Sequence, residues 1–219
     1  LEKIVSLNPE HISSYSLIIE PGTVFGDWEK NGTLKHVDED VDRQMYEWTG
    51  KYLQHMGYQR YEISNYCRDG MECRHNCVYW SGGEYLGLGV NASSYLTGYR
   101  FHVPVSQKTY RSYVDRICVL AEKESEGLKK AVQEMDELEF IDQRAQMEEF
   151  MFLGLRMMAG VSEQEFYQRF GISMMEVYGD IIKKYQNMDL LCRRDTGRVA
   201  LTEKGIDVSN SILSDFLLN

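Results

Sequence analysis

The pattern of residues 11–66 predicts a strand, a helix and a second strand in succession, and this order constrains the fold more than any other feature. The segment His11–Glu20 has the apolar content of a buried strand, Asp38 precedes an amphipathic helix that it can cap, and Tyr58–Tyr66 predicts a further strand. Strands joined through a helix are typical of parallel sheets, so we expect an α/β fold. Because two strands cannot close a barrel, either the chain is a piece of a larger α/β domain or these strands pair with elements that the pattern does not reveal.

The distribution of charge predicts a boundary after this region. Ser106 is placed to cap another amphipathic helix, and the following segment Glu122–Glu139 is rich enough in charged residues to be a connector. We therefore expect an α/β domain over residues 1–105, a helix with a charged connector over 106–139, and a helical domain over 140–219.

The helical domain has the sequence pattern of a winged-helix-like module. Two capping boxes follow each other closely, Ser162 with Glu165 and Ser173 with Glu176. Gly171 lies between them, which predicts two short helices joined as a helix-turn-helix. A hairpin with its turn at residues 195–197 and a last helix capped by Thr202 complete the pattern.

The charge of the chain argues against a nucleic-acid partner. The formal net charge is −10, whereas sequence-independent binding to phosphates needs clustered Lys and Arg. In the second helix of the predicted helix-turn-helix, two acidic residues oppose two lysines, so we expect it to pack or to dock a partner. Three arginines in the hairpin keep DNA binding open as the alternative: Arg193, Arg194 and Arg198.

The composition is that of a folded cytoplasmic protein. The hydrophobic content of 43% is ample for a packed core, and no apolar run approaches the roughly 20 residues needed to cross a bilayer. Five cysteines at unequal spacing do not suit a disulfide framework and fit a reducing compartment. Strands that lack neighbours expose edges that can pair with a second chain, so a homodimer is a further expectation.

The segment Arg74–Trp80 and the glycine-rich segment Gly87–Ser93 have the composition of a binding site. The first offers a histidine, an amide and two aromatic rings, and the second lets backbone approach a ligand closely. Together they suit the mouth of a site for a planar, carboxylated ligand. For Tyr79 and Trp80, hydrophobic packing beneath a loop is an equally good interpretation.

A metal site near these residues is the weaker interpretation, and we predict none. Cys67, Cys73, His75 and Cys77 are soft ligands close in sequence, but their spacing matches no common zinc module. In an extended segment, Cys73, His75 and Cys77 would project to one side.

Several motifs, in order along essentially the whole chain, resemble those of the oxygen-independent coproporphyrinogen III oxidase-like radical SAM family. The motifs are His11-Ile-Ser-Ser-Tyr, Glu20-Pro-Gly-Thr, Tyr61-Glu-Ile-Ser-Asn, His75-Asn-Cys-Val-Tyr-Trp, Tyr85-Leu-Gly-Leu-Gly and Leu201-Thr-Glu-Lys-Gly. The His-Asn-x-x-Tyr-Trp string marks the HemW-type heme chaperone branch, and true coproporphyrinogen oxidases carry a different sequence there. The chain thus resembles the carboxy-terminal portion of such a chaperone.

The resemblance implies a fold and a set of site residues. Residues 1–105 would be the last strands and helices of a partial (β/α) barrel, and the remainder a helical, winged-helix-like domain beside its mouth. His75 would be the heme ligand, a role that suits a neutral imidazole, with Asn76, Tyr79 and Trp80 shaping the site. Loops close to bound S-adenosylmethionine would hold a second set: Cys77, Val78, Gly87, Gly89, Ala92 and Ser93.

One motif of the family is missing from the chain. Family members hold a [4Fe-4S] cluster with a CxxxCxxC string, but here Trp80 stands at the third position after Cys73 and Cys77. We therefore expect the cluster and S-adenosylmethionine to be cofactors of a longer protein, and we predict no catalytic residues in this chain.

The expected function is that of a heme-binding and heme-transfer chaperone, with heme or a porphyrin and a heme-accepting protein as partners. Two alternatives stay open. One is oxygen-independent coproporphyrinogen III oxidase activity in porphyrin biosynthesis, and the other is a winged-helix interaction module that binds no heme.

Overall fold

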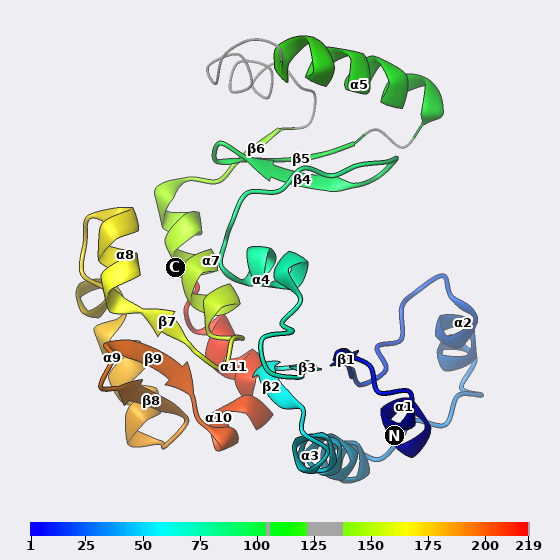
Figure 1. Ribbon diagram of the computed structural model, residues 1–219, viewed down its shortest axis with the longest axis vertical. Helices are drawn as coiled ribbons and strands as arrows, with labels where there is room; N and C mark the ends of the chain where they lie inside the picture. The colour runs from blue at the N-terminus through cyan, green and yellow to red at the C-terminus, as the bar shows by residue number, and fades with distance from the viewer. Residues whose placement is uncertain (104–105, 122–137, 219) are drawn as a thin grey trace. The chain divides into compact units, whose positions relative to one another are not determined.

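The computed structural model describes residues 1–103, 106–121 and 138–218 (Figure 1). They form two compact units, one of residues 1–73 with 157–159 and the other of residues 74–156 with 160–219. This division differs from the predicted domain boundary after residue 105, which stays a prediction. Most of the predicted charged connector lies outside the described residues.

The first unit contains a three-stranded antiparallel sheet with the strand order β1-β3-β2. Its strands are β1 (His11–Ser13), β2 (Gln59–Glu62) and β3 (Asn65–Cys67). The predicted single strand over residues 58–66 is wrong, because the chain reverses between β2 and β3. The predicted parallel pairing is wrong as well. Since β1 and β2 both run antiparallel to β3, they point in the same direction and lie on opposite sides of β3 in the sheet.

Buried side-chain hydrogen bonds hold the turn between β2 and β3. The carboxylate of Glu62 accepts hydrogen bonds from the backbone N–H of Ser64, at 3.1 Å, and from the side-chain amide of Asn65. Glu62 and Asn65 are both fully buried. The turn thus depends on a buried carboxylate rather than on a glycine or proline, which explains why the sequence pattern did not reveal it.

Three helices accompany this sheet: α1 (Glu2–Ser6), α2 (Val24–Lys30) and α3 (Glu39–His55). The predicted cap of α3 is confirmed, since the Asp38 carboxylate accepts from the N–H groups of Asp40 and Val41. The predicted strand over residues 11–20 ends at Ser13, because β3 offers three residues to pair with. The small core of the unit consists of Val5, Ile12, Leu53, Tyr58 and Tyr66.

The second unit begins with a short helix and an antiparallel sheet of strand order β4-β5-β6 (Figure 1). Its elements are α4 (Arg74–Trp80), β4 (Ser93–Leu96), β5 (Tyr99–His102), α5 (Gln107–Ala121) and β6 (Glu139–Phe140). The predicted cap of α5 is confirmed, because Ser106 Oγ accepts from the N–H of Thr109 at 3.2 Å. The predicted loop position of Cys77 and Val78 is wrong, since no glycine or proline interrupts residues 74–80 and this segment forms a helix.

The rest of the second unit combines helices with a sheet of strand order β7-β9-β8. Its elements are α7 (Gln143–Gly154), β7 (Val161–Ser162), α8 (Glu163–Phe170), α9 (Met174–Asn187), β8 (Leu191–Arg194), β9 (Arg198–Leu201), α10 (Glu203–Asp207) and α11 (Ser209–Ser214). The predicted helix pair and hairpin are therefore confirmed. The single last helix is wrong, because the backbone leaves the helical conformation at Val208.

The predicted caps in this part have different outcomes. Ser162 Oγ accepts from the N–H of Glu165 at 3.2 Å, and Thr202 Oγ1 accepts from the N–H of Gly205 at 3.0 Å. Gly171 ends α8 in the left-handed conformation. Ser173 occupies the cap position of α9, but in the described structure its side chain makes no capping hydrogen bond.

An aromatic core joins these helices. Phe166 of α8 contacts the rings of Phe150, Phe170 and Tyr178, and Tyr178 in turn contacts Phe216. Phe166, Tyr178 and Phe216 are fully buried. No helix in the described ranges has the length and apolar character that crossing a membrane requires.

Candidate functional site

His75 and Tyr79 lie on the same face of α4, because residues four positions apart are neighbours on a helix. The His75 Nε2 atom and the Tyr79 hydroxyl are 3.1 Å apart, and the rings meet edge to face at 88° with centroids separated by 4.9 Å. Both side chains belong to the predicted heme site. The helix thus holds a solvent-accessible imidazole against a phenol.

Two more tyrosines extend this aromatic surface from α4 to the sheet of β4 and β5. The Tyr79 ring lies 4.5 Å from the ring of Tyr85, which lies 6.4 Å from that of Tyr95. Tyr85 and Tyr95 also exchange two backbone hydrogen bonds of 2.9 Å each. Tyr95 is buried, and this burial raises the pKa of its hydroxyl, so the ring is neutral and well anchored.

An open cavity of about 630 Å³ lies beside these rings. Its lining residues are His75, Tyr79, Tyr85, Leu86, Gly87, Leu88, Ala92 and Ser93. The structure thus brings five of the predicted site residues together at one cavity: His75, Tyr79, Gly87, Ala92 and Ser93. The site prediction missed three lining residues, Tyr85, Leu86 and Leu88, although all three belong to the Tyr85-Leu-Gly-Leu-Gly motif.

The other predicted site residues do not line this cavity: Asn76, Cys77, Val78, Trp80 and Gly89. The Trp80 ring packs under the guanidinium of Arg156, whose carbon lies 4.5 Å from the ring centroid. Its indole N–H is buried and has no hydrogen-bond partner within the described ranges. For Trp80 these contacts favour the packing interpretation over a direct contact with a ligand.

The glycines beside the cavity serve different purposes. A Cβ atom at Gly87 would overlap the backbone carbonyl of Ser93, so glycine is needed there for close packing within the chain. Gly89 has a φ of +97°, and no atom lies within 4 Å of the position that its Cβ would take. Gly89 therefore supplies a backbone conformation, whereas Gly87 supplies space.

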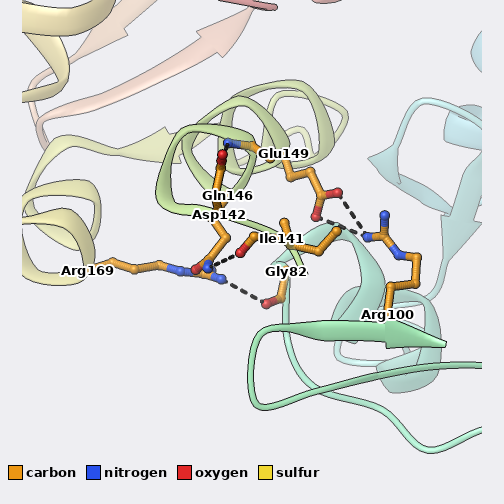
Figure 2. A network of polar contacts seen from close by, with 8 residues as sticks. Gly82, Arg100, Ile141, Asp142, Gln146, Glu149 and Arg169 are labelled. Carbon is orange, nitrogen blue, oxygen red and sulfur yellow. Dashed lines mark hydrogen bonds and ion pairs between the residues drawn. The ribbon is translucent and has the colours of Figure 1, made fainter. Parts of the chain in front are cut away.

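Two arginines connect the elements around the cavity to α7 and α8, as Figure 2 shows. Arg100 of β5 binds both carboxylate oxygens of Glu149 of α7, at 2.9 and 3.2 Å. Arg169 of α8 donates to the carbonyl oxygen of Gly82 at 3.3 Å. Burial lowers the pKa of Arg100, but its hydrogen bond and attraction to Glu149 outweigh this and raise it. Arg100 therefore stays charged, and its contact with Glu149 ties β5 to α7.

The cysteines do not form a cluster site in the described residues. Cys67 is buried, Cys73, Cys77 and Cys192 are half-buried, and Cys118 is exposed. No group of three or more His, Cys, Asp or Glu side chains is placed to hold a metal ion in the part of the chain that the structure describes. These residues therefore do not fit a [4Fe-4S] cluster, which needs three or four thiolates around one site.

Comparisons with known proteins show which family the chain is similar to. The sequence model of the HemN C-terminal domain matches residues 141–208. The heme chaperone HemW of Lactococcus lactis is 34% identical over 219 residues, which cover 100% of this chain and 53% of that protein. The chain is thus similar to HemW-type heme chaperones over essentially its whole length, and to the HemN C-terminal domain over residues 141–208. The family resemblance predicted from the motifs is thereby confirmed.

The chain spans about half the length of the curated relatives that it matches. The HemW of Bacillus subtilis is 34% identical over 213 residues, which cover 97% of this chain and 52% of that protein. Among solved structures, the radical SAM enzyme coproporphyrinogen III oxidase (HemN) of Escherichia coli superposes with a TM-score of 0.65 at 16% identity. That superposition covers 99% of this chain and 50% of the enzyme, and it shows a shared fold.

Proposed function

We propose that this chain binds heme at the cavity beside α4 and takes part in its transfer, the role for which its HemW relatives are named. The observation that carries the proposal is the position of His75, a cavity-lining histidine next to the rings of Tyr79 and Tyr85. A neutral imidazole is an axial ligand of heme iron, and flat apolar rings suit a flat macrocycle.

The size and openness of the cavity agree with a cargo that is taken up and released. A volume of about 630 Å³ lies within the range of about 300–1,000 Å³ that is typical of small-molecule sites. His75 Nε2 is engaged by the Tyr79 hydroxyl, so coordination of iron through Nε2 replaces that contact. In this proposal the heme is cargo, and its binding uses no other cofactor.

Replacing His75 by alanine tests this proposal. In titrations with hemin, the wild-type protein should develop a Soret band, and His75→Ala should bind on the order of ten-fold more weakly or worse because the axial ligand is gone. His36→Ala is the matched control, because His36 is an exposed histidine of the other unit. Equal hemin affinity of wild type and His75→Ala would contradict the proposed role of this histidine.

The remaining predictions for the site belong to the same proposal. Asn76 and Trp80 would shape the site without contacting the ligand, since neither lines the cavity. S-adenosylmethionine would bind near the segments that hold Cys77, Val78, Gly87, Gly89, Ala92 and Ser93. No group of cysteines in the described residues fits the cluster, and the proposed function of this chain includes no radical step.

We also propose that the chain contains a winged-helix-like domain and part of a (β/α) barrel, as the sequence predicts. The helix pair α8 and α9 followed by the β8–β9 hairpin supports a winged-helix-like domain. The shared fold with a radical SAM enzyme supports the proposal that residues 1–105 are the last part of a partial (β/α) barrel. Transfer to a heme-accepting protein, a homodimer and the domain division at residues 105 and 139 stay predictions.

A DNA-binding function is disfavoured by the charges on the β8–β9 hairpin. Arg193 pairs with Glu163 at 2.7 Å, and Arg198 lies 3.5 Å from Glu165. We expect no binding of duplex DNA up to roughly 100 µM at physiological salt. The reason is that Arg193 and Arg198 already form ion pairs with carboxylates of the same unit. An electrophoretic mobility or anisotropy titration measures this. Micromolar binding that falls with added salt would favour the interaction module instead.

A further inference from the structure

The loop Leu86–Val90 exposes apolar side chains at the edge of the cavity. Leu88 is 80% exposed, and Leu86 and Val90 are exposed to 43% and 47%. Leu86 and Leu88 line the cavity together with His75 and Tyr79. Apolar side chains in contact with water next to a cavity are a mark of a ligand-binding surface.

The backbone of this loop is held in place by side chains from other elements. The N–H of Gly87 donates to Ser94 Oγ at 2.9 Å, and Ser94 is fully buried. The N–H of Gly89 donates to the hydroxyl of Tyr110 on α5 at 3.2 Å. The exposure of Leu88 is therefore a consequence of a defined backbone conformation, in which its neighbours on both sides are anchored.

We propose that the site recognises a tetrapyrrole in two separable ways. His75 binds the metal, and the Leu86–Val90 loop packs against the apolar macrocycle, with Leu88 as the specificity-determining residue. Because packing against the ring does not require a metal, the same cavity takes metal-free porphyrins as well. This inference rests on the proposed heme function and adds the class of ligand and the residues that select it.

The physical argument is that the two contacts depend on different parts of the ligand. Coordination by an imidazole needs an iron atom and vanishes without one. Burial of a leucine side chain against a flat apolar ring scales with the apolar area removed from water, whatever lies at the centre of the ring. A substitution at each residue should therefore have a different effect on ligands with and without iron.

The experiment titrates the protein with hemin, followed by absorption, and with protoporphyrin IX, followed by its fluorescence. We expect Leu88→Asn to weaken the binding of both ligands by about ten-fold, since a polar side chain removes most of the apolar contact. We expect His75→Ala to weaken hemin binding and to leave protoporphyrin IX binding unchanged. Leu7→Asn is the matched control, because Leu7 is also 80% exposed but lies in the other unit.

The outcomes separate this inference from the heme proposal. If Leu88→Asn binds both ligands like the wild type, the role of the loop is overturned while the heme proposal stands. If wild type fails to bind protoporphyrin IX, or if His75→Ala weakens both ligands equally, separate recognition of metal and ring is overturned. Tyr110→Phe, which removes the anchor of Gly89 and leaves Leu88 in place, should weaken both ligands in the same proportion.

Discussion

Replacing Phe166 by alanine should destabilise the second unit by about 3–5 kcal/mol, the range typical of deleting a buried aromatic ring from a packed core. Phe166 is fully buried and contacts three aromatic rings, so the change leaves a cavity that its neighbours cannot fill. Since small domains have a total stability of about 5–15 kcal/mol, this loss is a large fraction of it. Urea denaturation followed by circular dichroism measures the free energy of unfolding.

Tyr167 provides the matched control at the next position of α8. Its side chain is 60% exposed, so Tyr167→Ala should change the free energy of unfolding by about 0.5 kcal/mol or less. If both variants unfold at the same urea concentration, the aromatic core is not the source of stability in this unit.

Replacing Gly160 by alanine should cost more than about 3 kcal/mol, because two effects act together. The φ of Gly160 is +70°, a left-handed conformation that an L-residue adopts only at a cost. In addition, a Cβ atom at this position would overlap the carbonyl oxygen of Val199 in β9, next to the start of β7. The backbone of one of the two segments must therefore shift, and thermal or urea unfolding would report the loss.

Gly171 separates the two effects at Gly160. Its φ is +73°, nearly the same, but no atom lies within 4 Å of the position of an added Cβ. Gly171→Ala should therefore cost only about 1–2 kcal/mol, the price of the left-handed conformation alone. An equal loss for both variants would show that the predicted overlap with Val199 relaxes without cost.

Features of the fold that depend on local chemistry could be predicted from the sequence. The caps at Asp38, Ser106, Ser162 and Thr202 are correct, because each depends on a side chain and a backbone N–H two or three residues away. The β8–β9 hairpin is correct because its turn is local as well: the N–H of Gly197 donates to the carbonyl oxygen of Arg194 at 3.0 Å. The cap at Ser173 shows the limit, since the same motif there leaves the side chain without its bond.

Features that depend on distant contacts could not be predicted. The turn between β2 and β3 is held by the buried carboxylate of Glu62, and its burial follows from the packing of the whole unit. At the site, the motif led to His75 and Tyr79, but the exposure of Leu88 depends on anchors at Ser94 and Tyr110 that no local pattern reveals. The sequence also gives no sign that Trp80 packs with Arg156.

If His75 binds heme iron as proposed, its contact with Tyr79 has a consequence for how firmly the iron would be held. If iron takes the Nε2 atom, the phenol loses its partner, and the free energy of that lost contact is subtracted from the affinity. When the metal leaves, the two side chains meet again and the imidazole is occupied once more. In the proposed function, a residue pair that re-forms its own contact in the empty state would favour release of the heme as well as permit its uptake.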